Sequence, residues 1–101
     1  MKKIGFGLVG TGAIAPYHIN AINTNKNASL IGIFSSTSSR AKRLAKKFNV
    51  KYYSSYIDML KDKSVEVVDV VTANYMHADY AIKAIENDKH VIVEKPIDTK
   101  V

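Results

Sequence analysis

Strand-like runs alternate with helix-like stretches along the whole chain, and this alternation limits the possible folds more than any other feature. The strand-like runs are rich in apolar and β-branched residues and cover residues 3–9, 28–35, 50–53, 65–71 and 90–93. Strands joined through helices pair in parallel, with right-handed connections. We therefore predict an α/β fold with a doubly wound parallel sheet, strand order 3-2-1-4-5, between two layers of helices.

Apolar residues recur every three or four positions between these runs, which is the spacing of a helix that buries one face. The first helix is expected over residues 13–23, and the first strand is expected to pack a helix closely on the side that carries Gly5 and Gly7. The residues predicted to face the sheet are, helix by helix, Ile14, His18, Ala21 and Ile22; Ala41, Leu44, Ala45 and Phe48; Ile57 and Leu60; and Ala78, Ala81, Ile82 and Ile85.

Short polar residues mark several helix ends. Ser38 or Ser39 is expected to cap the second helix at its amino end. Ser55 and Asp58 have the spacing of a capping box for the third. Asn87-Asp88 tolerates the left-handed backbone that commonly ends a helix, so the fourth should end there.

The chain length allows one domain, over residues 1–101, which ends before a sixth strand and leaves one sheet edge open. Hydrophobic residues make up 47% of the chain and charged residues 24%, as in globular proteins. No apolar stretch is long enough for a membrane span, no leader is visible, and cysteine is absent. We expect a cytoplasmic protein with no membrane partner, no disulfide and no metal site.

The formal net charge of +6 raises the question of a nucleic-acid partner. Much of the positive charge lies on the predicted second helix, at Arg40, Lys42, Arg43, Lys46 and Lys47. No aromatic residues that could stack on bases are interleaved with them. The pattern favours a solvated helix face, and we expect no nucleic-acid partner.

A glycine-rich turn, Gly10-Thr11-Gly12-Ala13-Ile14-Ala15, lies where the first strand gives way to a helix. In the pattern G-x-G-x-x-A, the first glycine allows the tight turn, the second lets a pyrophosphate approach the backbone, and the alanine keeps helix and strand close. Backbone N–H groups from Gly10 to Ile14 and the helix dipole would hold the phosphates. A tight turn without a ligand is the alternative, but the βαβ context favours a Rossmann dinucleotide site.

The end of the second strand bears on which dinucleotide is bound. NAD-specific folds place an acidic residue there, where it binds the ribose 2′-hydroxyl. This chain instead has Ser35-Ser36-Thr37-Ser38-Ser39-Arg40, which contains no carboxylate. Ser35, Ser36 and Arg40 could receive a 2′-phosphate, so NADP is the first choice and NAD the second. Alternatively, the serines only fill a loop and Arg40 is surface charge.

Three segments in order carry a family resemblance. They are Gly10 to Ala15 with His18 downstream, Val70 to His77, and Lys89 to Pro96 with its Glu-Lys-Pro. In these segments the chain resembles the Gfo/Idh/MocA family, named for glucose-fructose oxidoreductase and inositol dehydrogenase, over essentially its whole length. Ala73 and Asp88 depart from the proline and glycine that the family commonly has, without changing the expected fold.

The resemblance implies roles for residues in the two later segments. Thr72, Asn74 and His77 would contact the cofactor, with a helix-capping or core role as the alternative for His77. Glu94 and Lys95 would lie beside the nicotinamide, and Lys95 would be the catalytic residue. Lys95 would hydrogen-bond the hydroxyl being oxidised and assist its proton transfer.

The resemblance also implies a larger protein. Relatives continue into an α/β substrate domain that this chain lacks, so the chain alone should bind the cofactor without turnover. The complete protein would transfer a hydride between NAD(P) and a sugar, cyclitol or related hydroxyl-bearing small molecule. The alternatives are a non-catalytic dinucleotide-binding or sensing module, and a structural fragment that associates, as a homo-oligomer, through its open sheet edge.

Overall fold

The computed structural model describes residues 3–71 and 77–93 of the chain. In chain order, its elements are β1 (Ile4–Val9), α1 (Ala15–Thr24), β2 (Ala28–Phe34), α2 (Ser38–Phe48), β3 (Lys51–Tyr52), α3 (Tyr56–Lys61), β4 (Val67–Val70), α4 (His77–Glu86) and β5 (His90–Val93). The strands form one sheet in the order β3-β2-β1-β4-β5, and every neighbouring pair is parallel. The predicted doubly wound sheet and its strand order are confirmed.

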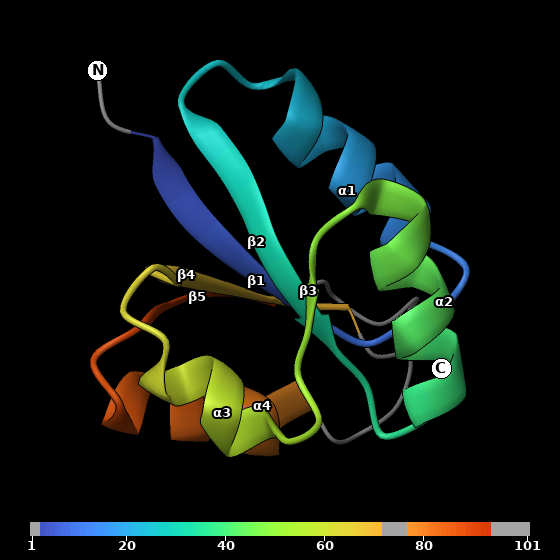
Figure 1. Cartoon of the computed structure of the whole chain (residues 1–101). Coiled ribbons are helices and arrows are strands. Elements are labelled where there is room, and N and C mark those ends of the chain that lie inside the picture. Colours follow the sequence, from blue (N-terminus) through green and yellow to red (C-terminus); the bar gives the residue numbers. More distant parts are fainter. Residues whose placement is uncertain (1–2, 72–76, 94–101) are drawn as a thin grey trace, which may run out of the picture.

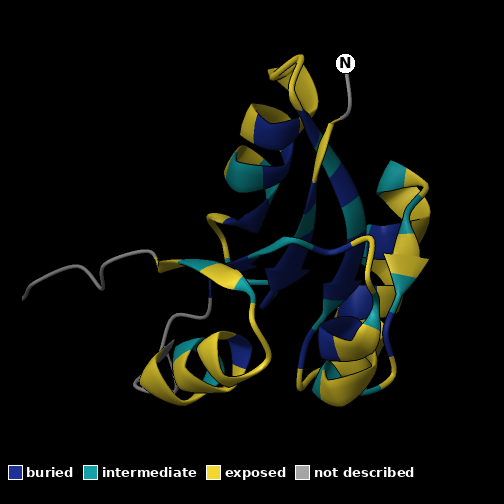
Figure 2. Ribbon diagram, turned by 90° about the vertical axis from the view of Figure 1, so that its left-hand side faces the viewer, coloured by how far each residue is buried: buried dark blue, intermediate teal, exposed yellow. Residues whose placement is uncertain are grey.

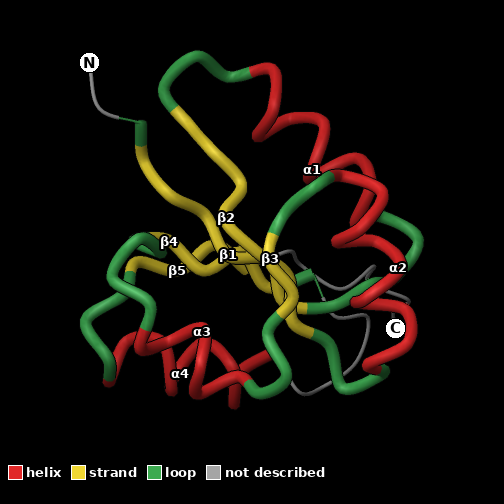
Figure 3. The backbone as a smooth tube through the Cα atoms, viewed as in Figure 1, coloured by secondary structure: helices red, strands yellow, loops and turns green. Residues whose placement is uncertain are grey.

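Helices cover both faces of the sheet and form a three-layer structure. Figure 1 shows α1 and α2 on one side of the strands and α3 and α4 on the other, and the backbone tube in Figure 3 shows the same layers. The buried apolar residues accordingly form two clusters, one centred on Leu8, Ile19 and Ile33 and the other on Val9, Met59 and Val68. Burial is concentrated in the strands between the layers (Figure 2).

A shift in register lets β2 serve both clusters. Strand partners step from Phe6–Leu30 to Gly7–Gly32, so Ile31 is passed over. This extra residue changes the alternation of side chains, because a strand otherwise sends every second residue to the same face. Leu30 and Ile33, three positions apart, therefore both pack in the cluster beneath α1 and α2.

Two packing predictions are confirmed. A Cβ on Gly7 would lie 2.7 Å from the sulfur of Met59 on α3, so a helix does pack closely against the glycine side of β1. On α2, Ala41 and Ala45 are buried, and Leu44 and Phe48 pack against the same cluster while half-buried.

The predicted buried face of α4 is wrong for three of its four residues, and the fourth, Ala81, is half-buried. Ile82 and Ile85 are 54% and 62% exposed, and Ala78 is exposed as well, whereas Ala84 is fully buried. The helix is oriented by Tyr80, whose backbone carbonyl accepts a hydrogen bond from Tyr56 Oη at 2.7 Å. Helical spacing alone could not distinguish these two faces, because each shows apolar residues three or four positions apart.

Smaller differences affect α1 and α3. The buried residues of α1 are Ala15, Ile19 and Ile22, so the prediction holds for Ile22 and fails for Ile14 and Ala21, which are exposed.

In α3, Leu60 is buried as predicted. Ile57 is exposed instead of buried. Met59, which was not among the predicted core residues, is fully buried and packs against Gly7.

The element boundaries also differ by a few residues. Helix α1 covers residues 15–24 instead of 13–23, and the third strand keeps only residues 51–52 of the predicted 50–53. The fourth strand is 67–70 rather than 65–71, although Val65 and Val71 at its flanks are buried.

Among the residues that the structure describes, no helix has the length and apolar character of a membrane span.

The helix-end predictions give mixed results. Ser55 Oγ accepts a hydrogen bond from the Asp58 N–H at 3.2 Å, which confirms the cap of α3. Asp88 has φ 63°, so the left-handed residue after α4 is confirmed. The predicted cap of α2 is wrong, because Ser38 and Ser39 lie inside the helix and Thr37 occupies the N-cap position without a capping side-chain bond.

Candidate functional site

The glycine turn joins β1 to α1 at the carboxyl end of the sheet. Gly10 has φ 109°, a backbone conformation that glycine adopts far more readily than other residues. Its N–H donates to the carbonyl of Phe34, the last residue of β2, at 2.8 Å. The turn therefore lies directly beside the end of β2, as a shared dinucleotide site would require.

The N–H groups of residues 11–14 are available to a ligand. None of them donates a hydrogen bond to an acceptor in the described part of the chain. Helix α1 follows at Ala15, with a proline in its first two positions and no acidic side chain in its first turn. The positive end of the helix dipole is therefore not neutralised locally, which suits an anion.

Gly12 has open space where a side chain would begin. A Cβ placed there would come no closer than 3.7 Å to the nearest atom, the carbonyl oxygen of Val71, which is ordinary contact. Gly7, by contrast, is crowded by Met59. Internal packing thus explains the glycine at position 7 but not the one at position 12, where the backbone is open to the approach of a ligand.

The serine-rich loop after β2 is tied to the glycine turn. Ser35 is buried, its hydroxyl lies 3.4 Å from Thr11 Oγ1, and it accepts a hydrogen bond from the Thr37 N–H at 3.1 Å. Ser36 and Arg40 are exposed. Ser35 therefore shapes the loop, while Ser36 after β2 and Arg40 in the first turn of α2 remain accessible.

Thr11 and Arg40 line a shared depression of about 270 Å³ between the glycine turn and α2. Leu44, Arg43 and Lys47 complete its lining. The sequence pattern indicates only a solvated surface for Arg43 and Lys47, because the position of α2 beside the turn is a property of the packed fold.

A polar pair that sequence reasoning missed connects α1 to β4. His18 Nδ1 lies 2.7 Å from Asp69 Oδ2, and the Asp69 side chain is only 4% exposed. His18 was predicted to lie on the apolar face of its helix, and Asp69 sits inside a run of valines. An acidic residue in the middle of a central strand was the available signal, since a buried carboxylate requires partners.

Five of the predicted site residues cannot be placed. Thr72, Asn74, Glu94 and Lys95 lie outside the described residues, as does the side chain of His77, the first residue of α4. The strands that precede them are neighbours, because Val70 of β4 and Val93 of β5 are register partners. Strands β4 and β5 therefore end at the same edge of the sheet.

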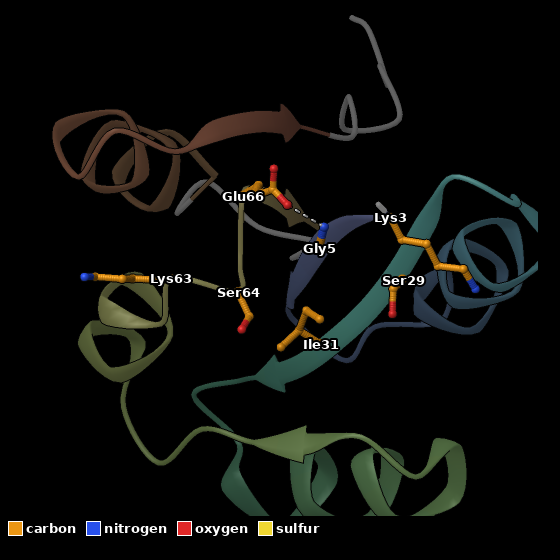
Figure 4. Close-up of a pocket in the computed structure, with 7 residues that line it drawn as sticks. All are labelled: Lys3, Gly5, Ser29, Ile31, Lys63, Ser64 and Glu66. Atoms are coloured by element: carbon orange, nitrogen blue, oxygen red, sulfur yellow. Dashed lines mark hydrogen bonds between the residues drawn. The ribbon is translucent and has the colours of Figure 1, made fainter. Parts of the chain in front are cut away.

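The opposite, amino-terminal edge of the sheet carries another depression, of about 390 Å³. Lys3 and Lys63 line it but extend in opposite directions, and Glu66 accepts a hydrogen bond from the Gly5 N–H at 3.2 Å (Figure 4). Its charged groups do not converge on one point.

Within residues 3–71 and 77–93, no cluster of His, Asp or Glu could hold a metal ion.

Known proteins resemble this chain in sequence and in fold. A family model described as an oxidoreductase family with an NAD-binding Rossmann fold matches residues 4–101. Glucose-6-phosphate 3-dehydrogenase of Bacillus subtilis is 37% identical over 97 residues, which are 96% of this chain and 27% of that protein.

Solved structures of other proteins have a similar fold. Myo-inositol dehydrogenase from Lactobacillus casei, in complex with NAD(H) and myo-inositol, superposes with a TM-score of 0.85 at 28% identity, over 96% of this chain and 30% of that one. KijD10, a 3-ketoreductase from Actinomadura kijaniata in complex with NADP and TDP-benzene, gives a TM-score of 0.86 at 28% identity, over 97% of this chain and 30% of that one.

The chain thus spans between 27% and 30% of the length of these relatives. The family match covers nearly the whole chain, and the glycine turn at the carboxyl end of the parallel sheet agrees with its description. The chain belongs to the Gfo/Idh/MocA family of oxidoreductases and forms its NAD-binding Rossmann domain.

Proposed function

We propose that this chain is the cofactor domain of an enzyme that transfers a hydride between a nicotinamide dinucleotide and a hydroxyl-bearing sugar or cyclitol. The observation that carries the proposal is the glycine turn, where the N–H groups of residues 11–14 make no hydrogen bond within the described chain and Gly12 has open space. The dehydrogenase relatives support the substrate class.

The residues of the turn fit the diphosphate of such a cofactor. Thr11, Gly12, Ala13 and Ile14 would hold it through backbone N–H groups and the amino end of α1. Gly10, whose own N–H is bonded to the Phe34 carbonyl, would bring the turn close to it. Thr72, Asn74 and His77 would approach it from the loop after β4, because ligands of doubly wound sheets bind beyond the carboxyl ends of the strands. When bound, the nicotinamide would supply or accept the hydride.

Lys95 would handle the proton of the reacting hydroxyl. Its position two residues after β5 and the Glu-Lys-Pro resemblance support this role, with Glu94 on the cofactor side. A lysine ammonium can donate a hydrogen bond to the substrate oxygen and stabilise the negative charge that develops there. Because the relatives are much longer, we assign turnover to a longer polypeptide and cofactor binding to this chain.

We propose NADP as the preferred cofactor. Ser36, just beyond the carboxyl end of β2, and Arg40, in the first turn of α2, are exposed. The segment from Ser35 to Arg40 contains no carboxylate that would repel a 2′-phosphate. Arginine pairs well with phosphate through its planar set of N–H donors. NAD is the alternative, and relatives with each cofactor are known.

A glycine substitution tests the dinucleotide site. Gly12→Ala should leave the melting temperature nearly unchanged, because the new Cβ would meet only the Val71 carbonyl at 3.7 Å. The methyl group would occupy the space of the diphosphate, so calorimetric titration should show NADP⁺ affinity reduced by about tenfold or more. Unchanged affinity in a folded Gly12→Ala protein would contradict the proposed site.

Lys95 requires a kinetic test in the polypeptide that carries the substrate domain. With myo-inositol or glucose 6-phosphate as substrate, Lys95→Met should lower kcat by about a hundredfold or more. Its Kd for the cofactor should stay within about threefold of the parent value, since the proposed role concerns the proton. An unchanged kcat would exclude that role, and cofactor binding with no turnover by the parent on any polyol would favour a sensing module.

A further inference from the structure

The five basic residues of α2 do not share one environment, although the sequence places them on one helix. Lys42 extends over the ring of Tyr52, with its Nζ 5.5 Å from the ring centroid. Arg40, Arg43 and Lys47 line the depression beside the glycine turn, and the Nζ of Lys47 also lies 5.6 Å from the centroid of the Phe48 ring. Lys46 is exposed and does not line that depression.

The depression combines cations with a hydroxyl-bearing wall. Arg40, Arg43 and Lys47 are spaced by three and four residues, which places them on one side of the helix. Thr11 forms the opposite wall, fixed by the contact of its hydroxyl with Ser35, and Leu44 is half-buried between them. None of the described residues that line it is acidic.

A compact dianion would complement this lining. Three cations would attract it, and the guanidinium groups could donate paired hydrogen bonds to phosphate oxygens. Thr11 belongs to the same turn that would hold the cofactor diphosphate, so a ligand in the depression and one on the turn would be adjacent. The 2′-phosphate of NADP is such a group, because the ribose that bears it lies near the end of the second strand in this fold.

We infer that Arg43 and Lys47 act with Arg40 as specificity determinants for a 2′-phosphate. This inference rests on the proposed dinucleotide site and extends it along α2 by two turns. It assigns a function to residues whose charge pattern alone indicates only a solvated face. The exposed positions of Arg43 and Lys47 allow substitution without disturbing the core.

Calorimetric titration with NADP⁺ and NAD⁺ tests the inference on the wild type, Arg43→Ala, Lys47→Ala and the double variant. The matched control is Lys46→Ala, which removes the same charge from the same helix outside the depression. Arg43→Ala should weaken NADP⁺ binding by about tenfold and NAD⁺ binding by less than about twofold, with Lys47→Ala somewhat less severe. Lys46→Ala should change either affinity by less than about twofold.

The outcomes separate this inference from the proposed function. If Arg40→Ala weakens NADP⁺ binding while Arg43→Ala and Lys47→Ala do not, the extended site is wrong and the NADP assignment stands. Equal losses for Arg43→Ala and Lys46→Ala, or equal losses for both cofactors, would also overturn it. If the wild type prefers NAD⁺, the NADP assignment is wrong. If the wild type binds neither cofactor, the proposed dinucleotide site is wrong. Either result would also overturn the inference about Arg43 and Lys47.

A direct comparison of fragments checks the ligand group itself. Wild type should bind 2′,5′-ADP more tightly than 5′-AMP by about tenfold, and Arg43→Ala should remove most of that difference. If the difference persists in Arg43→Ala and in Lys47→Ala, another group recognises the 2′-phosphate. Melting curves of each variant confirm that it is folded before affinities are compared.

Discussion

At the scale of single residues, Asp62 connects three parts of the amino-terminal side of the sheet. Its carboxylate accepts hydrogen bonds from Tyr53 Oη at 2.6 Å, Lys51 Nζ at 3.0 Å and the Ser64 N–H at 2.8 Å. The hydrogen bond from Tyr53, followed by the contributions of Lys51 and Ser64, outweighs desolvation and lowers the pKa of Asp62 to about 2 from an ordinary 3.8. The ionised form is therefore favoured by folding.

This pKa shift predicts how stability depends on pH. Because the folded pKa lies below the unfolded value, Asp62 contributes to stability fully above about pH 4, and the contribution disappears as the pH falls toward 2. Urea unfolding of the wild type and Asp62→Asn should show a difference in unfolding free energy at pH 6 that narrows at pH 2.5. A difference that is independent of pH would show that the carboxylate is not the source.

The His18–Asp69 pair is a second residue-scale feature, and it predicts strong coupling in a double-mutant cycle. His18→Leu alone removes a partner from a carboxylate that is almost fully buried, so it should lower the unfolding free energy by roughly 3 kcal/mol. Asp69→Val added to His18→Leu should recover part of that loss, because an apolar pair can replace a buried polar pair. Denaturant unfolding measures the cycle, and additive effects would argue against the coupling.

At the scale of elements, the orientation of α4 is decided by an aromatic cluster. Tyr56 lies edge-to-face with Tyr80 at a centroid distance of 5.0 Å and stacks on Phe34 at 5.7 Å. These rings join the end of β2 to the start of α3 and to α4. With Tyr80 held inward, Ala84 one turn later faces the sheet and the isoleucines of the helix face outward.

The helix face can be tested by paired substitutions. Ile85→Gln should change the unfolding free energy by no more than about 0.5 kcal/mol, because the side chain is exposed. Ala84→Leu should destabilise by about 1–3 kcal/mol, because Ala84 is fully buried and the core has no room for a larger group. Chemical denaturation measures both, and the reverse ranking would mean that the isoleucine face is the buried one.

At the scale of the whole molecule, the described surface includes apolar side chains at one end of the sheet. Ile92 and Val93 of the edge strand β5 are 46% and 41% exposed, and Ile92 lines a depression with Phe6 and Tyr17 on the α1 side of the sheet. The relatives are more than three times as long as this chain. Apolar surface of this kind is therefore available for additional residues of such a longer protein to cover. A cofactor bound at the proposed site, beyond the carboxyl ends of β1 and β2, should stabilise the domain by mass action.

Thermal melting checks that linkage. At about one hundred times its Kd, NADP⁺ should add about 2.7 kcal/mol to the unfolding free energy, which for a domain of this size raises Tm by on the order of 10 °C. NAD⁺ at the same concentration should raise Tm less, because its affinity is expected to be lower. At that concentration Gly12→Ala, with its affinity reduced by about tenfold, should gain only about 1.4 kcal/mol, roughly half of the wild-type increase. An equal increase in that variant would place the ligand elsewhere.

Much of the architecture could be predicted from the sequence because the relevant signals are local. The valine-rich run around Val68, the helical spacing of Ala41 and Ala45, and the glycine pattern of the turn each act over a few residues. The parallel order followed from the connections between them, since chirality leaves few alternatives. The cofactor turn could be located for the same reason, as its glycines mark a strand-to-helix junction.

The remaining features depended on contacts between distant segments. Which face of α4 is buried was decided by Tyr56 and Phe34, and the His18–Asp69 pair joins residues 51 positions apart. The depression of Thr11, Arg43 and Lys47 exists only where α2 packs beside the glycine turn. Sequence alone determined the elements, their order and the cofactor motif, because backbone propensity and periodicity are local. The tertiary structure decided helix rotation, polar pairing and which cations converge, because these depend on packing between elements that no local pattern encodes.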